Sequence, residues 1–221
     1  MKILFLSLVL GSVALTSSCK KEKTESKETY TIAKPSAENG TIYALDLNES
    51  VVNWSGSKPG GKHTGTIKLK EGFVTIKDSI VTSGRFFMDM NTITVTDLKP
   101  EEGKSDLENH LKGLGDKKKK DHFFNVTKYP SSDFKITKVE KAEGNVLIYG
   151  NLSIKGITKA VNFPATLTIN DKEVIIDSDK LVLNRTYFNV KYASKSVFGD
   201  LKDKFINDEI EIQVKVKANR Q

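Results

Sequence analysis

Cysteine is almost missing from this chain: Cys19 is the only one among 221 residues. A lone cysteine excludes an internal disulfide framework and any zinc site built from several thiolates. After Cys19 no apolar run is long enough for a helix to cross a bilayer, which excludes a multi-span membrane protein. The signatures G-x-S-x-G, P-loop and H-E-x-x-H are also absent, so we expect a protein that is not an enzyme and uses no cofactor.

Histidine and clustered positive charge are scarce as well. The three histidines, His63, His110 and His122, are predicted to lie on different elements, so we expect no metal site. The net charge is +7, but the lysines are scattered apart from the run 117–120, which no aromatic residues interleave. We therefore expect no nucleic-acid partner. We interpret the lysine run as a solvated loop, with contact to anionic head groups as the alternative.

The first residues resemble an export signal. A lysine gives a positive start, Ile3–Leu15 is an apolar run, and small residues lead to Cys19. This order resembles a bacterial lipobox, although Leu15 lies one position further from the cysteine than usual. We assign 1–18 as a lipoprotein signal peptide and Cys19 as the lipidated residue, with an ordinary cleaved signal as the alternative. Lys20 stands where an aspartate would signal inner-membrane retention, so we expect a lipid anchor in the outer membrane facing the periplasm.

A composition change separates this signal from the folded part. Residues 20–41 are charged, small and poor in large apolar groups, so they cannot bury enough surface to offset their ordering entropy. We expect 19–41 to be the lipidated cysteine with a flexible tether, and 42–221 to be one folded domain. Apolar residues make up 38% of the chain and charged residues 29%, which is typical of a globular domain of this length.

The folded part is dominated by alternation with a period of two. The clearest cases are Val161–Ile169 and Ile210–Val216, where apolar and polar residues take turns, as in strands with one dry face. Weaker alternation and glycine-containing turns predict further strands. These lie at 52–54, 67–69, 73–76, 80–90, 92–95, 134–139, 146–154, 174–177 and 181–190, with turns at 59–61, 71–72, 143–145 and 170–171. The short intervals predict antiparallel meanders that form a closed barrel or a sandwich.

Two segments break the alternation. Ser105-Asp106-Leu107-Glu108 is typical of a capping box, and Gly113 could end the short helix that follows it. A second short helix is predicted from Ser196 to Ile206. The fold class is therefore mainly β with one or two short helices.

Motifs between and within these strands resemble the YceI-like family of periplasmic and secreted isoprenoid-binding proteins. The resemblance covers roughly Tyr43 to Lys217. The matching segments are 43–46, 50–54, 63–67, 71–73, 93–95, 106–111, 122–126 with 129–130, 150–158, 184–190 and 208–212. Three features depart from the family pattern: 113–120 is an insertion, Asn189 replaces a common glycine, and His122 replaces a common acidic residue.

The resemblance implies an antiparallel, eight-stranded, lipocalin-like β-barrel that holds a long apolar chain in its pore without catalysis. A barrel of this size is just wide enough to fill itself or to hold one slender ligand. We therefore expect non-enzymatic storage or transport of an isoprenoid lipid or isoprenoid quinone. The alternative is a structural barrel with a self-filled core that binds protein or polysaccharide at the cell envelope.

Candidate ligand contacts follow from this expectation. Phe86, Met88 and Met90 share one face of a strand with Gly84, and that face is either a cavity wall or ordinary core. Of the adjacent Phe123 and Phe124, only one could point inward if both lie in a strand. The expected cavity residues are Trp54, Phe86, Met88, Met90, Phe123, Phe134, Tyr149, Phe163 and Phe188.

Arg185 and Tyr187 are the candidates for contact with a lipid head group. An arginine near the pore could bind a phosphate or a quinone oxygen. The alternative for Arg185 is a structural ion pair, which is the commoner role of an arginine in this setting.

Overall fold

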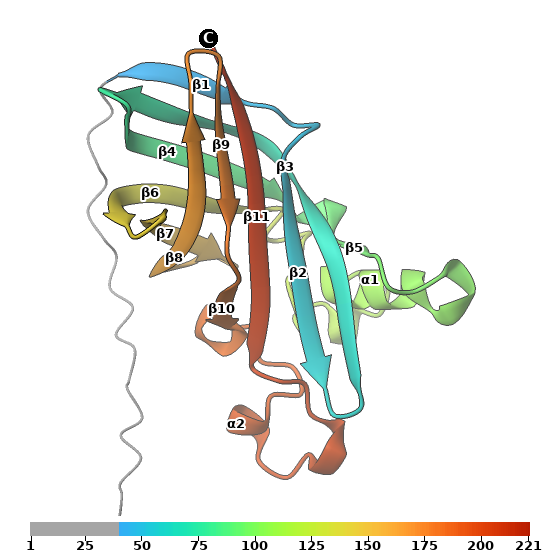
Figure 1. Ribbon diagram of the computed structural model, residues 1–221. Coiled ribbons are helices and arrows are strands. Elements are labelled where there is room, and N and C mark those ends of the chain that lie inside the picture. The colour runs from blue at the N-terminus through green and yellow to red at the C-terminus, as the bar shows by residue number, and fades with distance from the viewer. Residues whose placement is uncertain (1–39) are drawn as a thin grey trace, which may run out of the picture.

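Strands form one antiparallel sheet that closes on itself in the computed structural model, which describes residues 40–221 (Figure 1). Eight of them make the ring, which closes because β11 pairs with β2 on one side and β9 on the other. In ring order they are β2 (Val51–Lys58), β3 (Gly61–Lys77), β4 (Ile80–Asp89), β6 (Ser131–Ala142), β7 (Asn145–Ile154), β8 (Ile157–Ile169), β9 (Glu173–Ser178) and β11 (Glu209–Arg220). The predicted eight-stranded barrel is therefore confirmed, and the sandwich is not.

Three short strands complete the wall. β1 (Thr41–Leu45) pairs with β11 and β3 beyond the end of β2, so β1 and β2 fill the same slot in succession. β10 (Leu181–Asn184) follows β9 along β11 in the same way, and β5 (Thr94–Val95) pairs with β3. The long strands β3 and β11 are thus paired over most of their length, although several of their partner strands are short.

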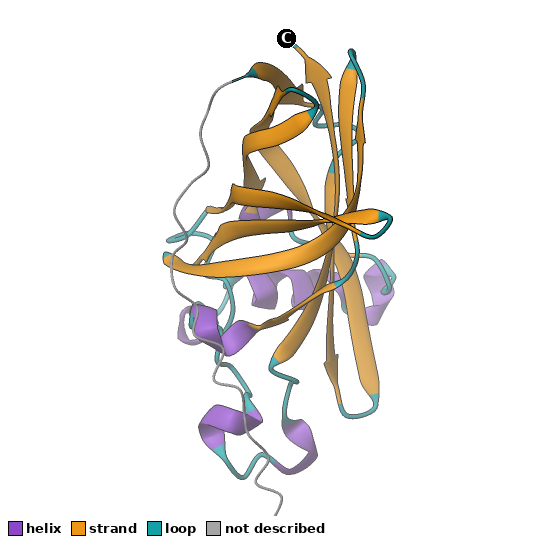
Figure 2. Ribbon diagram, turned by 60° about the vertical axis from the view of Figure 1, so that its left-hand side comes forward, coloured by secondary structure: helices purple, strands orange, loops and turns teal. Residues whose placement is uncertain are grey.

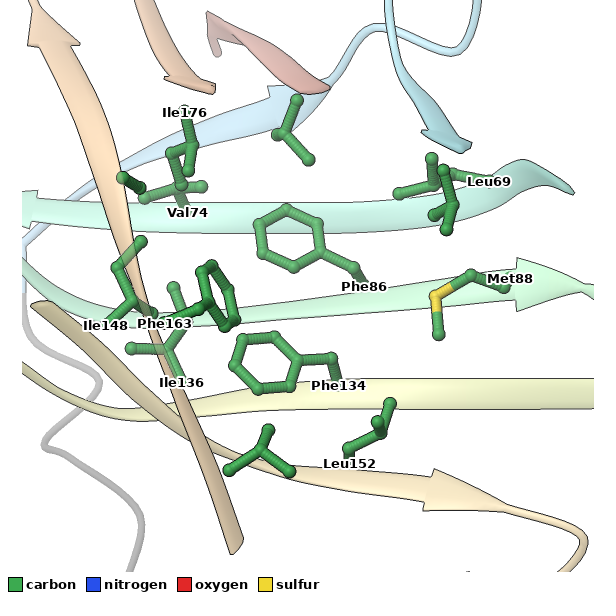
Figure 3. Packing of buried hydrophobic residues seen from close by; sticks show 14 of the residues in the cluster. Leu69, Val74, Phe86, Met88, Phe134, Ile136, Ile148, Leu152, Phe163 and Ile176 are labelled. Atoms are coloured by element: carbon green, nitrogen blue, oxygen red, sulfur yellow. The ribbon is translucent and has the colours of Figure 1, made fainter. Parts of the chain in front are cut away.

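Burial follows the alternation that the sequence predicts. In β8 Val161, Phe163 and Ala165 are buried, whereas Asn162 and the other residues between them are exposed. The inward side chains pack into one core cluster from every strand of the ring, as the close view in Figure 3 shows for the middle of the barrel. Whether a residue has an odd or an even position in its strand therefore decides whether it faces the interior or water.

The turns agree with the predicted positions except at 71–72. Pro59-Gly60, Glu143-Gly144 and the segment 170–172 each lie between paired strands. The prediction of a turn at Glu71-Gly72 is wrong, because β3 runs through this point with a bulge against β4. A Cβ on Gly72 would lie 2.8 Å from Cδ1 of Phe86, so the glycine serves close packing and not reversal of the chain.

Two α-helices and several single turns lie outside the barrel, toward the end opposite the C-terminus (Figure 2). α1 (Lys104–Lys112) begins after Gly103, so the prediction that Ser105 caps it is wrong. Glu108 instead accepts a hydrogen bond from the Val95 amide at 2.9 Å, which ties the helix to β5. Gly113 ends α1 with φ +74°, as predicted.

The helix predicted at 196–206 and the strand predicted at 181–190 are both shorter in the structure. α2 (Lys195–Phe198) is followed by Gly199 with φ +66° and by a separate 3-10 turn, so one helix from 196 to 206 is wrong. The predicted strand 181–190 ends at Asn184, where a 3-10 turn (Arg185–Phe188) begins. Within residues 40–221, no helix is both long and apolar enough to span a membrane.

Candidate functional site

The barrel encloses one large apolar cavity of about 610 Å³. Its walls come from the inward face of nearly every strand of the ring, including the side chains labelled Phe86, Met88 and Phe134 in Figure 3. Its lining also includes exposed residues of the β2–β3 hairpin and of the segment 193–206, such as Lys58 and Lys204. The cavity therefore reaches the surface at the pole that carries α2 (Figure 1).

Most of the residues predicted as cavity contacts line this space. They are Trp54, Phe86, Met88, Met90, Phe123, Phe134 and Phe163. Phe86 and Met88 project from β4 beside Phe134 of β6, and the rings of Phe134 and Phe163 lie 5.5 Å apart. The alternation in β4 explains this grouping, since Phe87 on the other face packs against the Arg85 guanidinium at 4.5 Å.

Phe123 and Phe124 both line the cavity, whereas the prediction allowed only one of them to point inward if both lay in a strand. The physical reason is that they do not lie in a strand. The backbone of 123–126 runs back along the end of α1, with Phe124 N donating to the Leu111 carbonyl at 3.1 Å. Irregular backbone of this kind can direct two adjacent side chains to the same side.

Two predicted residues lie elsewhere. Tyr149 is on the outer face of β7, where its hydroxyl bonds the Glu140 carboxylate, and this bond raises the pKa of Tyr149. Its neighbour Ile148 takes the inward position, so the alternation of β7 places Tyr149 outside the cavity. Phe188 is almost completely buried in the core but does not line the cavity.

Arg185 lines the cavity, yet its guanidinium is already engaged. Its three nitrogens donate to the backbone carbonyls of Asn207, Val190 and Ile206 at 2.9, 2.8 and 2.9 Å. The Asp208 carboxylate lies 3.6 Å away, and burial lowers the pKa of Arg185. This arrangement matches the structural alternative for Arg185. Tyr187, the other head-group candidate, is 42% exposed and lies outside the cavity.

Sequence reasoning missed a cluster of rings beside the cavity. His110 on α1 and His122 after it were predicted on separate elements, but His110 Nε2 lies 2.8 Å from His122 Nδ1. Tyr192 stacks on His122 with 3.9 Å between ring centroids, and Phe123 packs edge-on against His110 at 5.1 Å. His110, Tyr192 and Phe123 line the cavity.

The chain reversal at Gly113 explains why this pair was missed. It sends the following segment back along α1, so that Val126 N donates to the Lys112 carbonyl at 2.8 Å. Burial lowers the pKa of both histidines, and His110 is lowered further by His122 and by Lys119. The spacing of the two histidines in the sequence therefore does not predict their contact. The glycine that ends α1 was the feature from which the chain reversal, and so the contact, could have been predicted.

The same cluster gives no metal centre. Within the described range 40–221, no group of three or more His, Cys, Asp or Glu side chains converges. His63, the third histidine, bonds the Asp97 carboxylate at 2.9 Å on another part of the wall.

The segment 150–158, one of the segments that carry the family resemblance, shapes this end of the barrel. Lys155-Gly156 forms the β7–β8 turn with φ of +50° and +74°. The Lys155 side chain is 3% exposed, and its ammonium donates to the carbonyls of Asn189 and Asp121 at 3.2 and 3.4 Å. Asn189 has φ +58°, so asparagine supplies the left-handed backbone for which glycine is common. Lys155 thus fixes the segment that contains His122 against the end of the 185–188 turn.

Comparison with known proteins agrees with this architecture. A crystal structure of BcnA from Burkholderia cenocepacia is similar with a TM-score of 0.61 at 21% identity, covering 79% of this chain and 99% of that one. A polyisoprenoid binding domain from Saccharophagus degradans, implicated in plant cell wall breakdown, gives 0.60 at 12% identity, covering 82% and 99%. No curated protein matches the sequence. A family model described as YceI-like domain matches residues 43–218.

Proposed function

The chain belongs to the YceI-like domain family, and from this premise we propose that it stores or transports an isoprenoid lipid or isoprenoid quinone inside its barrel. The ligand is held without chemistry, by burial of its tail. The proposal includes a lipid anchor at Cys19, which lies outside the described residues, and an outer-membrane position facing the periplasm. We also propose that the protein uses no cofactor and binds no nucleic acid.

The apolar cavity carries this proposal. A barrel that served only as a scaffold would fill its interior with its own side chains, because empty apolar space forfeits packing contacts. Here about 610 Å³ remains between aromatic, aliphatic and methionine side chains. This volume lies in the range of small-molecule sites.

The shape of the wall favours a flexible hydrocarbon. Burial of a tail contributes about 0.8 kcal/mol per methylene-sized group before ordering costs. Met88 and Met90 add adaptable thioethers where a branched tail would lie. The Saccharophagus degradans domain of similar fold is a polyisoprenoid binding domain by its description, which supports the same class of ligand here.

The test is recovery of the ligand. The full chain with Cys19→Ala, purified without detergent, is extracted with organic solvent and the extract is analysed by mass spectrometry. We expect an isoprenoid in the extract, or uptake of an added one. A folded protein that neither contains nor takes up an isoprenoid would favour the scaffold that binds protein or polysaccharide.

The anchor has a separate readout. The unmodified chain expressed in a bacterial envelope should fractionate with membranes, and Cys19→Ala should release it to the soluble fraction. Equal distribution of the two chains would contradict lipidation without affecting the cavity proposal.

A further inference from the structure

The polar groups of the cavity wall differ in whether their hydrogen bonds are already made. Trp54 Nε1 and Ser132 Oγ each donate to a backbone carbonyl, at 3.3 and 2.6 Å. Arg185 is held by three carbonyls, and His63 by the Asp97 carboxylate. The donors of Trp54, Ser132 and Arg185 cannot bind a ligand without breaking an existing bond, which leaves a buried acceptor unsatisfied. His63 keeps a second ring nitrogen, but its side chain is partly exposed and lies apart from these groups.

Two lining groups that are neighbours also keep hydrogen-bonding capacity. Among residues 40–221, neither His110 Nδ1 nor the Tyr192 hydroxyl has a partner. Both side chains are partly exposed, and neither atom is a buried polar atom without a partner. Their rings meet edge to face with centroids 5.0 Å apart, so the two residues are neighbours in the wall.

His122 makes the His110 site adaptable. If His122 Nδ1 carries the shared proton and donates to His110 Nε2, then His110 has its proton on Nδ1 and donates from there. If His110 Nε2 carries the proton, His110 Nδ1 is an acceptor. One neutral pair can therefore match either a carbonyl or a hydroxyl oxygen of a ligand.

The surroundings favour an uncharged head group with a ring. Phe123 and Tyr192 flank His110 with aromatic surface, and Leu107 and Leu111 line the wall beside it on α1. The cavity-lining lysines, Lys58 and Lys204, are exposed residues at the rim. Lys119 lies near the two histidines and lowers the pKa of both, but it does not line the cavity. A phosphate would thus pair with the lysines at the mouth of the cavity. A planar, uncharged ring would instead pack on the apolar surface around His110 and Tyr192, which supply two hydrogen-bonding groups.

We infer that His110 and Tyr192 form the head-group subsite of the barrel, and that the head group is an uncharged ring that carries a carbonyl or hydroxyl oxygen. His122 positions His110 and sets its tautomer. The inference rests on the proposed function, because it assumes that a lipid tail fills the rest of the cavity.

The test compares three probes on the full chain with Cys19→Ala. They are the naphthoquinone that carries a geranylgeranyl tail, geranylgeranyl monophosphate, and squalene, which has no head group. The variants are His110→Phe and Tyr192→Phe, which keep the aromatic rings and remove the polar atoms. The matched control is Ser132→Ala, which removes a lining hydroxyl that is already bonded to the backbone.

We expect each ring variant to weaken binding of the quinone by roughly three- to tenfold, the loss of about one hydrogen bond, and to leave squalene unchanged. Ser132→Ala should not favour one probe over another. The nitrogen chemical shifts of His110 should also move when the quinone binds, which a merely structural role would not produce.

Three results would overturn the inference. In the first, the variants weaken the quinone no more than squalene. In the second, they weaken the phosphate more than the quinone, which would assign the site to an anionic head group. In the third, the wild-type chain binds none of the probes, and the proposed function then fails with it. Binding of all three probes, with no selective effect of either variant, leaves the proposed function intact and rejects the subsite alone.

Discussion

Phe134 occupies the space that a side chain at Gly150 would need: a Cβ on Gly150 would lie 2.2 Å from Cζ of Phe134. Gly150 of β7 pairs with Ile136 of β6, so the Phe134 ring reaches it diagonally from two residues along β6. Gly150, which belongs to the family-like segment 150–158, thus leaves room for a cavity-lining ring to pack against the β7 backbone.

Gly150→Ala should destabilise the barrel by about 1–3 kcal/mol, because the added methyl overlaps the Phe134 ring and forces it to move. Equilibrium denaturation measures this. Gly61→Ala is the control, since its Cβ would meet nothing closer than 3.5 Å. Phe134→Leu combined with Gly150→Ala should recover part of the loss, and an equal loss in both glycine variants would refute the packing argument.

Met88→Trp should block ligand uptake while the barrel still folds. Met88 lines the cavity, and the larger ring takes volume that the tail needs. We expect at least a tenfold loss of affinity for an isoprenoid, measured by displacement of a fluorescent probe. Val182→Trp is the matched control, because Val182 is 52% exposed on β10. Unchanged uptake by Met88→Trp would remove Met88 from the binding wall.

Arg185→Lys should lower stability and not ligand selectivity. The lysine keeps the charge but cannot donate to three carbonyls at once, so buried acceptors and Asp208 lose their partner. We expect a loss of roughly 3 kcal/mol in the free energy of unfolding. Arg85→Lys should cost under about 1 kcal/mol, since that ion pair to Asp133 is partly exposed. A stable Arg185→Lys protein with altered head-group preference would support the head-group role instead.

Acid should weaken the fold through the His110–His122 pair. Burial and repulsion from His122 and Lys119 lower the pKa of His110, and burial and Lys119 lower that of His122, with Asp116 opposing. The unfolded chain then binds more protons, so the stability that these residues contribute is complete above the ordinary pKa of 6.5 and is lost as pH falls below it.

Denaturation at a series of pH values measures this loss, and His122→Phe, which keeps the ring on Tyr192, should flatten the profile. Tyr192 is the other titratable group in contact with the pair. A wild-type profile that stays flat between about pH 7.5 and 5.5 would contradict the prediction.

Asn189 can be exchanged for glycine at little cost, but not for a β-branched residue. Its φ of +58° lies in the left-handed region, which glycine adopts freely and valine adopts with strain. Asn189→Val should destabilise by about 1–2 kcal/mol in thermal or chemical denaturation, whereas Asn189→Gly should stay within a few tenths. If both variants lose the same stability, the side chain and not the backbone is responsible.

The alternation along β8 and β4 was enough to predict strands with one inward face and most of the cavity lining, whereas the choice of a barrel over a sandwich came from the family resemblance. Val161 and Phe163, and likewise Phe86 and Met88, face inward because strand parity is a local property. The same rule explains why Tyr149 does not line the cavity. Its aromatic ring suggested burial, but it follows the inward-facing Ile148 in β7, and neighbouring residues of a strand point to opposite faces.

The rest depended on contacts between distant segments. The bulge in β3 exists because β4 pairs against it, and Glu108 bonds Val95 on another element instead of capping its own helix. His110 meets His122 only because the chain reverses at Gly113. Such relationships have no period in the sequence, which is why the head-group subsite was not predicted.

The position of β11 has a consequence for how the protein is made. The ring closes only through β11, which comes last along the chain and pairs with β2, β9, β10 and β1. Until the ribosome has added Glu209–Arg220, the nascent polypeptide is an open sheet with unpaired edges and no enclosed interior. We therefore expect a chain that stops before Glu209 to leave the edges of β2 and β9 unpaired and to aggregate.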